Sequence, residues 1–352
     1  MRKFNYKKYN NTFNDTELWS LVSGIHEYKG KQELYLSQKP ATLERLIEIA
    51  KIQSTEASNA IEGIHTSNSR LKQLVKEKTT PRNRDEEEIA GYRYVLNEIH
   101  ESFEYIPITP NYILQLHGHL YRFTNKSYGG QYKNSQNQIV ANDSNGNEII
   151  LFTPLTPFET PTAIESICQE YNNCIENEII DPLILIPIFI HDFLCIHPFN
   201  DGNGRMSRLL TTLLLYRSGY VVARYISLEK KIADDKDLYY DALAMCQDNW
   251  NEGNENPLPF IKYLLRTIIA AYKDFQDRVI LVEGRKTAKD QVREAISIKI
   301  GRFTKSEMME LCPCVGKSSV ENALTALVKD GYIIRCGTGR GTYYIRSDAN
   351  NI

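Results

Sequence analysis

The chain has 352 residues, of which 42% are hydrophobic and 24% charged, as in an ordinary globular protein with room for two or three domains. Its formal net charge of −2 gives no overall indication of nucleic-acid binding. The longest apolar run, residues 183–190, is too short to span a bilayer.

The N-terminal part of the chain predicts loops and then a helix. Residues 1–34 are polar and rich in tyrosine, which favours loops with one short helix near residues 15–25. A longer helix is predicted from about Thr42 to Glu62, because apolar residues recur there at helical spacing.

This predicted helix ends in the run Ser-Asn-Ala-Ile-Glu-Gly at residues 58–63. Ser58 and Glu62 are four residues apart and therefore share one helix face. Gly63 is suited to the left-handed residue that follows a helix end. Taken alone, the run predicts no more than an ordinary helix end.

Two more helices are predicted in the next part of the chain. One follows the charged segment 78–88, and the other spans about residues 110–121. His117 and His119 project from different faces of the second helix, so we do not expect them to form a metal pair.

A β-hairpin is predicted next. The turn-forming residues 143–147 separate two short extended runs, 136–141 and 148–153. An exposed hairpin edge can pair with an extended peptide and present one of its side chains at a chosen place.

A buried helix is predicted to start at Asp181-Pro182, an N-cap residue followed by a first-turn proline, and to lead to His197. Residues 197–208 then read His-Pro-Phe-Asn-Asp-Gly-Asn-Gly-Arg-Met-Ser-Arg. The apolar stretch that follows predicts another buried helix, beginning near residue 203.

The residues of this run suit a nucleotide phosphate chain. Gly202, Asn203 and Gly204 predict a turn whose free N–H groups, at the positive end of a helix dipole, face an anion. Arg205 and Arg208 are three residues apart on the first turns of the helix, and guanidinium groups bind phosphates in a bidentate manner.

Two further residues of the run carry the remaining chemistry. Asp201 stands just before the turn, where a carboxylate beside phosphates most often holds Mg²⁺. His197 is placed to accept a proton from an incoming hydroxyl group. Together the run predicts a site that handles a nucleotide.

Residues 197–208 resemble the signature of the Fic (Fic/Doc) family, His-Pro-Phe-x-Asp/Glu-Gly-Asn-Gly-Arg-x-x-Arg. Family members mostly transfer AMP from ATP to a hydroxyl side chain of a target protein. The resemblance implies that His197 is the general base and that Asp201 binds Mg²⁺ at the α- and β-phosphates. It also implies an anion hole at residues 202–204, with Arg205 at the β-phosphate and Arg208 at the γ-phosphate.

Residues 58–63 are similar to the inhibitory motif of this family, Ser/Thr-x-x-x-Glu-Gly/Asn. The resemblance implies that Glu62 pairs with Arg208 in the place of the γ-phosphate, with Ser58 and Gly63 completing the motif. The physical basis is that one guanidinium cannot serve a carboxylate and a phosphate at once.

The predicted hairpin resembles the flap of this family, on which the target segment docks in family members. Its working edge would be Gln136, Asn137, Gln138, Ile139 and Val140. The family usually has an arginine after Gly-x-Tyr where this chain has Lys133, and we assign Lys133 no role.

A weaker resemblance concerns the nucleotide base. Family members often have a Tyr-Tyr pair near the adenine, here Tyr239 and Tyr240, and an asparagine further on, where this chain has Gln247. Aromatic residues at this spacing belong more often to a hydrophobic core than to a ligand site, so both interpretations stay open.

The last 70 residues predict a separate domain. A linker at 283–287 is followed by helices at 304–312 and 317–329 and a glycine-rich hairpin at 332–345, which resembles a winged helix-turn-helix domain. Residues 283–352 hold 12 Lys or Arg against 8 Asp or Glu, a basic bias that suggests DNA. The second helix carries Glu321 in its middle and lysines only near its ends, so protein docking or self-association is favoured over DNA.

The compartment is predicted from the N-terminus and the cysteines. The first residues, Met-Arg-Lys-Phe-Asn-Tyr-Lys-Lys, lead into polar sequence rather than the apolar segment of a signal peptide. The seven cysteines are odd in number and lack partners at zinc-finger spacing, so we expect reduced thiols, no structural metal and a cytoplasmic location.

These observations predict a mainly α protein, a Fic-type helical bundle with a hairpin flap. The expected domains are a helical region at 1–100, the catalytic core at 101–282 and a winged helix-turn-helix domain at 283–352. We expect a protein adenylyltransferase that uses Mg²⁺ and ATP on a Ser, Thr or Tyr hydroxyl, is inhibited by Glu62, and forms a homodimer. The alternatives are AMP removal, transfer of another phosphate-containing group, and a DNA-binding regulator whose Fic domain senses a nucleotide.

Overall fold

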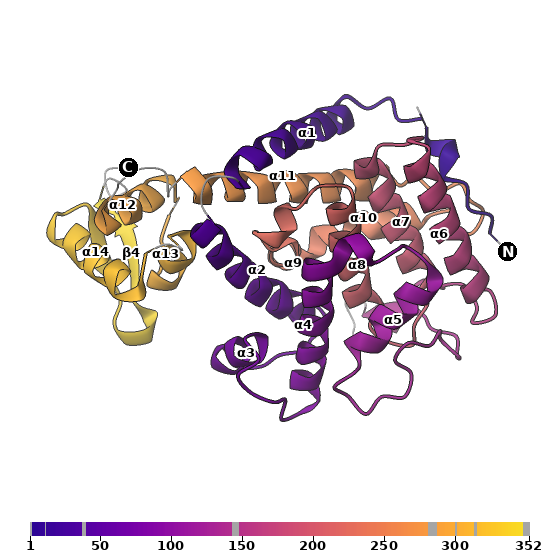
Figure 1. Cartoon of the computed structure of the whole chain (residues 1–352), viewed down its shortest axis with the longest axis horizontal. Helices are drawn as coiled ribbons and strands as arrows, with labels where there is room; N and C mark the ends of the chain where they lie inside the picture. The colour runs from indigo at the N-terminus through magenta and orange to yellow at the C-terminus, as the bar shows by residue number, and fades with distance from the viewer. Residues whose placement is uncertain are drawn as a thin grey trace. The chain divides into compact units, whose positions relative to one another are not determined.

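The computed structural model describes residues 2–10, 12–36, 40–142, 148–280, 287–299, 301–312 and 315–347. The fold is mainly helical, as predicted (Figure 1). The α-helices are α1 (Thr16–Leu36), α2 (Pro40–Ile61), α3 (Asn68–Val75), α4 (Arg84–Ser102), α5 (Pro110–Leu120), α6 (Thr160–Glu176), α7 (Pro182–Ile196), α8 (Asn203–Arg217), α9 (Leu228–Asp234), α10 (Lys236–Gln247), α11 (Leu258–Ile280), α12 (Ala288–Ile298), α13 (Lys305–Leu311) and α14 (Lys317–Lys329). The strands are β1 (Ile139–Asn142), β2 (Glu148–Phe152), β3 (Ile333–Cys336) and β4 (Tyr343–Arg346), and short 3-10 helices cover Tyr6–Tyr9, Phe103–Tyr105, Val222–Arg224 and Gly339–Gly341.

The chain divides into two compact units. The first contains Met1–Gly30 and Ala50–Ala271, and the second contains Lys31–Ile49 and Tyr272–Ile352. All residues of the predicted nucleotide site belong to the first unit. The three domain boundaries expected from the sequence stay predictions.

Helices α7 and α8 form the buried centre of the first unit. The Asp181 carboxylate caps the N-terminus of α7 by accepting from the Leu183 N–H at 2.8 Å, and Pro182 occupies the first turn, as predicted. Every residue of α7 from Leu183 to Ile196 is buried, because the helix is apolar around its whole circumference. It packs against α6 and α8, and α8 also packs against α4.

Strands β1 and β2 pair as the predicted antiparallel hairpin, with Val140 opposite Ile150 and Ile139 opposite Phe152. The register shifts between Ile139 and Val140. The first strand begins at Ile139, so Gln136, Asn137 and Gln138 precede it rather than belong to it. The predicted turn at 143–147 lies outside the described residues.

Helix α1 is longer than predicted, since it continues well past residue 25 to Leu36. The added length is polar and includes Gly30, features that gave no helical signal. A tertiary contact helps to hold it, because the Lys29 ammonium donates to the Ser218 carbonyl at 2.9 Å. Such a contact cannot be foreseen from local sequence.

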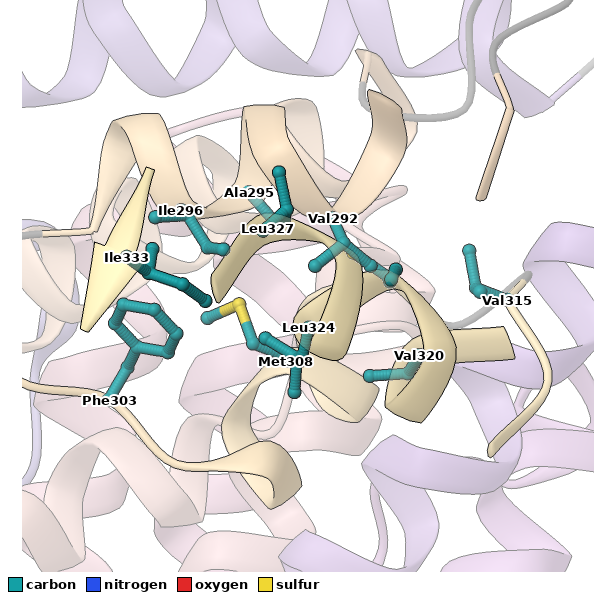
Figure 2. Close-up of a cluster of buried hydrophobic side chains, with 12 residues drawn as sticks. Val292, Ala295, Ile296, Phe303, Met308, Val315, Val320, Leu324, Leu327 and Ile333 are labelled. Carbon is teal, nitrogen blue, oxygen red and sulfur yellow. The ribbon is translucent and has the colours of Figure 1, made fainter. Parts of the chain in front are cut away.

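The C-terminal part of the second unit has its own hydrophobic core. Figure 2 shows Met308, Leu324, Leu327 and Ile333 gathered between helices and strand, and all four are buried. Phe303 pairs through its backbone with Tyr344, which extends the β3–β4 hairpin.

The helices α13 and α14 agree with the predicted ones, whereas α12 was not predicted. The capping box of Thr287 and Asp290 starts α12. Most of the predicted linker at 283–287 lies outside the described residues. That this part is a winged helix-turn-helix domain stays a prediction.

None of the helices in the described part of the chain combines the length and apolar character needed to cross a membrane. Six cysteines fall among the described residues, and no disulfide joins any two of them. The same residues contain no group of three or more His, Cys, Asp or Glu side chains arranged to hold a metal ion.

Candidate active site

Residues 197–202 form a loop that connects two buried helices, α7 and α8. The backbone is left-handed at both ends of the loop, with φ of 52° at His197 and 85° at Gly202. A Cβ atom at Gly202 would stand 2.8 Å from the Tyr121 hydroxyl, so only glycine fits. At His197 the same backbone conformation is unfavourable by about 1 kcal/mol, and surrounding contacts must hold it.

The His197 imidazole is neutral and has a defined tautomer. Its Nδ1 lies 3.2 Å from the Leu194 carbonyl oxygen, which can only accept, so Nδ1 carries the proton and Nε2 is left as the basic nitrogen. Burial lowers the pKa of His197 to about 4. The ring is therefore unprotonated at neutral pH, so Nε2 has a free lone pair, which the predicted general base needs.

Arg208 is buried and pairs with the predicted inhibitory motif. Its Nε donates to the Ser58 hydroxyl at 2.8 Å, and its Nη2 donates to the Glu62 carboxylate at 2.7 Å. Gly63 has a φ of 77° and follows α2, as predicted. Ser58, in the last turn of α2, and Glu62, one residue beyond the end of α2, thus both contact the same guanidinium.

The Glu62 carboxylate also stands against the first turn of α8. A Cβ atom at Gly204 would overlap the Glu62 Oε1. The N-terminus of a helix offers unpaired N–H groups and a positive dipole end. Glu62 therefore lies where the sequence predicts that an anion binds.

Asn203 and Arg205 brace the loop. The Asn203 side chain accepts from the Phe199 N–H at 2.9 Å and donates to the Phe199 carbonyl at 2.7 Å. The Arg205 guanidinium is 1% exposed, forms an ion pair with Glu88 at 2.8 Å and donates to the Tyr121 hydroxyl at 2.8 Å. Both were predicted to bind phosphate, yet neither lines the cavity described below.

Both carboxylate oxygens of Asp201 accept hydrogen bonds. Its Oδ1 accepts from the Gly202 N–H at 2.7 Å, and its Oδ2 accepts from the Lys126 ammonium at 3.0 Å and the Tyr128 hydroxyl at 3.2 Å. Burial works to raise the pKa of Asp201, but the Lys126 and Arg205 cations outweigh it and lower the pKa to about 2.

The donor chemistry of Asp201 fits Mg²⁺. One charged, 41% exposed carboxylate, together with substrate oxygens, is a common magnesium environment. However, the Lys126 ammonium forms an ion pair with the Oδ2 atom of Asp201 and another with Glu88 at 2.9 Å. An ion at Asp201 would have to displace this ammonium from Oδ2.

A cavity of about 550 Å³ lies beside the loop. Its walls come from Glu62 after α2, from the hairpin and Gln138 before it, and from α7, α8 and α10, with His197 directly after α7. They are lined by Glu62, Gln138, Ile139, Val140, Leu151, Leu194, His197, Gly204, Arg208, Tyr239, Tyr240, Leu243, Ala244 and Gln247. His197, Arg208, Tyr239, Tyr240 and Gln247 thus line one cavity, although they are distant in sequence.

Two of the five predicted flap residues, Gln136 and Asn137, do not line the cavity. Gln136 donates to the Pro154 carbonyl at 3.0 Å, and Asn137 donates to the carbonyls of His197 at 3.3 Å and Phe199 at 3.1 Å. Both side chains are therefore directed to backbone groups, while Gln138, Ile139 and Val140 line the cavity.

Several supporting residues escaped the sequence analysis. The sequence predicts no role for His117, yet its ring stacks on Phe199 with centroids 3.6 Å apart. Its Nδ1 accepts from the Gly130 N–H at 3.0 Å, so Nε2 donates to the Asp201 carbonyl at 3.0 Å. No local pattern marks such a residue, nor Lys126, nor the buried Lys133.

Comparison with known proteins agrees with this geometry. Residues 107–215 match the Fic/DOC family. A Fido domain-containing protein of Dictyostelium discoideum is 30% identical over 121 residues, which cover 33% of this chain and 80% of the relative. The protein adenylyltransferase Fic of Nematostella vectensis is 25% identical over 237 residues. That match covers 64% of this chain but only 48% of the relative.

Solved structures show the same fold. A Fic family protein from Desulfovibrio desulfuricans superposes with a TM-score of 0.62 at 21% identity, over 95% of this chain and 97% of that one. A Fic domain-containing signaling protein from Bacteroides thetaiotaomicron gives 0.59 at 25% identity, over 74% and 95%. The chain belongs to the Fic/DOC family.

Proposed function

We propose that this protein is a protein adenylyltransferase, which transfers AMP from ATP to a hydroxyl side chain of a target protein. The observation that carries the proposal is that the neutral His197 and the buried Arg208 line one cavity at the N-terminus of α8. Several relatives are named protein adenylyltransferases, which supports the same activity.

The proposed reaction is a displacement at the α-phosphorus. The hydroxyl oxygen of a target Ser, Thr or Tyr attacks the α-phosphorus, and the bond from that phosphorus to the bridging oxygen of the β-phosphate breaks. The hydroxyl proton passes to Nε2 of His197, and pyrophosphate leaves. Positioning and charge neutralisation supply most of the catalysis in such reactions.

Other residues in and beside the cavity would bind the two substrates. The N–H groups at the start of α8 and Arg208 would hold the phosphates, and Tyr239, Tyr240 and Gln247 would contact the adenine. Asp201 would hold Mg²⁺, which neutralises phosphate charge when bound. The edge of β1 from Ile139 would receive the target segment.

In this proposal Glu62 keeps activity low. Its carboxylate accepts from Arg208 at 2.7 Å and lies against Gly204. It therefore pairs with the cation, and fills the space, that a terminal phosphate would need. A phosphate and the carboxylate cannot both bind this guanidinium in the same geometry.

The test uses wild type, Glu62→Gly and Glu62→Gly/His197→Ala, each incubated with Mg²⁺, a cell lysate as acceptor and ATP labelled at the α- or γ-phosphate. We expect protein-bound label from the α position alone, strongest in Glu62→Gly and absent in the double variant. Label from the γ position would indicate phosphoryl transfer instead. Release of AMP from previously modified protein, without incorporation, would indicate a removal activity.

A further inference from the structure

Lys133 and Asn137 lie against the backbone of the 197–202 loop and the end of α7. The Lys133 N–H donates to the Pro198 carbonyl at 2.8 Å, and its ammonium donates to the Ile196 carbonyl at 3.0 Å. The same ammonium donates to the Asn137 Oδ1 at 2.9 Å. The Asn137 amide in turn donates to the carbonyls on either side of Pro198, those of His197 and Phe199.

These contacts satisfy the last carbonyl group of α7 and three carbonyl groups of the loop after it. The last carbonyls of an α-helix have no intrahelical donor, and here the chain turns left-handed at His197 immediately after α7. The four consecutive carbonyls from Ile196 to Phe199 each receive a donor from Lys133 or Asn137. The backbone that carries the imidazole is therefore fixed from outside its own helix.

The burial of Lys133 is notable for a lysine. Only 3% of the residue is exposed, and burial lowers its pKa to about 8. Enclosing an ammonium is unfavourable unless hydrogen bonds compensate, and its bonds to Ile196 and Asn137 provide them. Its side chain is therefore placed for a specific contact with the loop.

We propose that Lys133 and Asn137 are positioning residues that hold His197 in its left-handed, proton-accepting orientation. The inference rests on the proposed function in one respect, which is that His197 is the base. Asn137 also stands two residues before β1, and Ile139 of that strand lines the cavity. Lys133 and Asn137, which we call the clamp, thus connect β1, the strand that would receive the target, to His197, the residue that would take its proton.

The test compares Lys133→Met, Lys133→Arg and Asn137→Ala in the Glu62→Gly background. Lys29→Met is the matched control, because Lys29 also caps a helix-end carbonyl, that of Ser218, at the opposite end of α8 from Gly204. Steady-state transfer of α-labelled AMP gives kcat and the KM for ATP. Hydrogen exchange of peptides covering residues 193–200 reports on the loop without requiring activity.

We expect Lys133→Met and Asn137→Ala to lower kcat about 10- to 100-fold with little change in KM, the cost of a misplaced reacting group. Lys133→Arg should restore most of kcat, and Lys29→Met should match its parent. Hydrogen exchange at residues 193–200 should become faster in Lys133→Met and Asn137→Ala only.

A kcat for Lys133→Met and Asn137→Ala within about twofold of the parent would overturn the proposal. If Lys133→Met does not fold, the result with Asn137→Ala decides, because that change leaves the buried ammonium bonded to Ile196. If the Glu62→Gly parent itself incorporates no α-label, the proposed function fails, and exchange alone tests the clamp. Unchanged exchange at 193–200 would then refute it.

Discussion

Removing the Glu62 carboxylate is the change from which we expect the clearest gain of function. In the Glu62→Gly variant, Arg208 keeps its two hydrogen bonds to Ser58, at 2.8 and 2.9 Å. It loses its ion pair with Glu62. The space beside Gly204 opens at the same time. Both changes favour a bound terminal phosphate.

The magnitude follows from the burial of the pair. A hydrogen bond to a charged group contributes about 1.5–3 kcal/mol when it is well shielded. Arg208 is 3% exposed but the Glu62 side chain is 32% exposed, so water screens part of the interaction and about 1–2 kcal/mol remains. This corresponds to about 5- to 30-fold tighter binding of ATP.

The assay is calorimetric titration of Mg·ATP into proteins that also carry His197→Ala, which prevents turnover. Glu62→Gln serves as the control, because it keeps the shape of the side chain and removes its charge. We expect Glu62→Gly to bind more tightly than Glu62→Gln, and both to bind more tightly than the parent. Equal affinity for the parent and a folded Glu62→Gly variant would refute the inhibitory role of Glu62.

Two further predictions concern the metal and acid stability. Lys126→Met should tighten divalent-ion binding at Asp201 about tenfold, measured with Mn²⁺ by electron paramagnetic resonance, because the competing ammonium is gone; weaker binding would show that Lys126 assists the ion. Burial lowers the pKa of four histidines to between about 3 and 4, namely His100, His117, His191 and His197. Since unfolding lets each take up a proton below its usual pKa of about 6.5, the stability present above that pH is lost as pH falls towards 4, by up to about 1.4 kcal/mol per pH unit for each histidine. The buried Asp192, whose pKa is raised to about 6, acts in the opposite direction and offsets the loss of stability from about one of the four histidines. Urea unfolding midpoints that are equal at pH 7 and pH 5 would contradict the expected loss.

Local sequence patterns were enough to predict the elements that carry the site. The end of α2 at the Ser58–Gly63 run, the cap at Asp181 and the start of α8 at Asn203 all follow from capping chemistry and apolar periodicity. The hairpin and its antiparallel pairing also followed from turn-forming residues. These features depend on neighbours within a few positions along the chain.

The direction of individual side chains could not be predicted in the same way. Arg205 is turned to Glu88, and Asp201 is paired with Lys126, which is 75 positions away in the chain. Lys133 reaches carbonyls more than 60 residues later. These partners are decided by how α4, α5 and the segment before the hairpin pack around the loop, and no spacing rule records that packing.

The most direct test of the central claim is the identity of the group attached to the modified protein. Peptide mass spectrometry of the acceptor, after incubation with Glu62→Gly protein, Mg²⁺ and ATP, should find AMP on a serine, threonine or tyrosine oxygen. The same peptide should be unmodified after incubation with Glu62→Gly/His197→Ala. A phosphate alone on that oxygen, or AMP attached equally well without His197, would contradict the account.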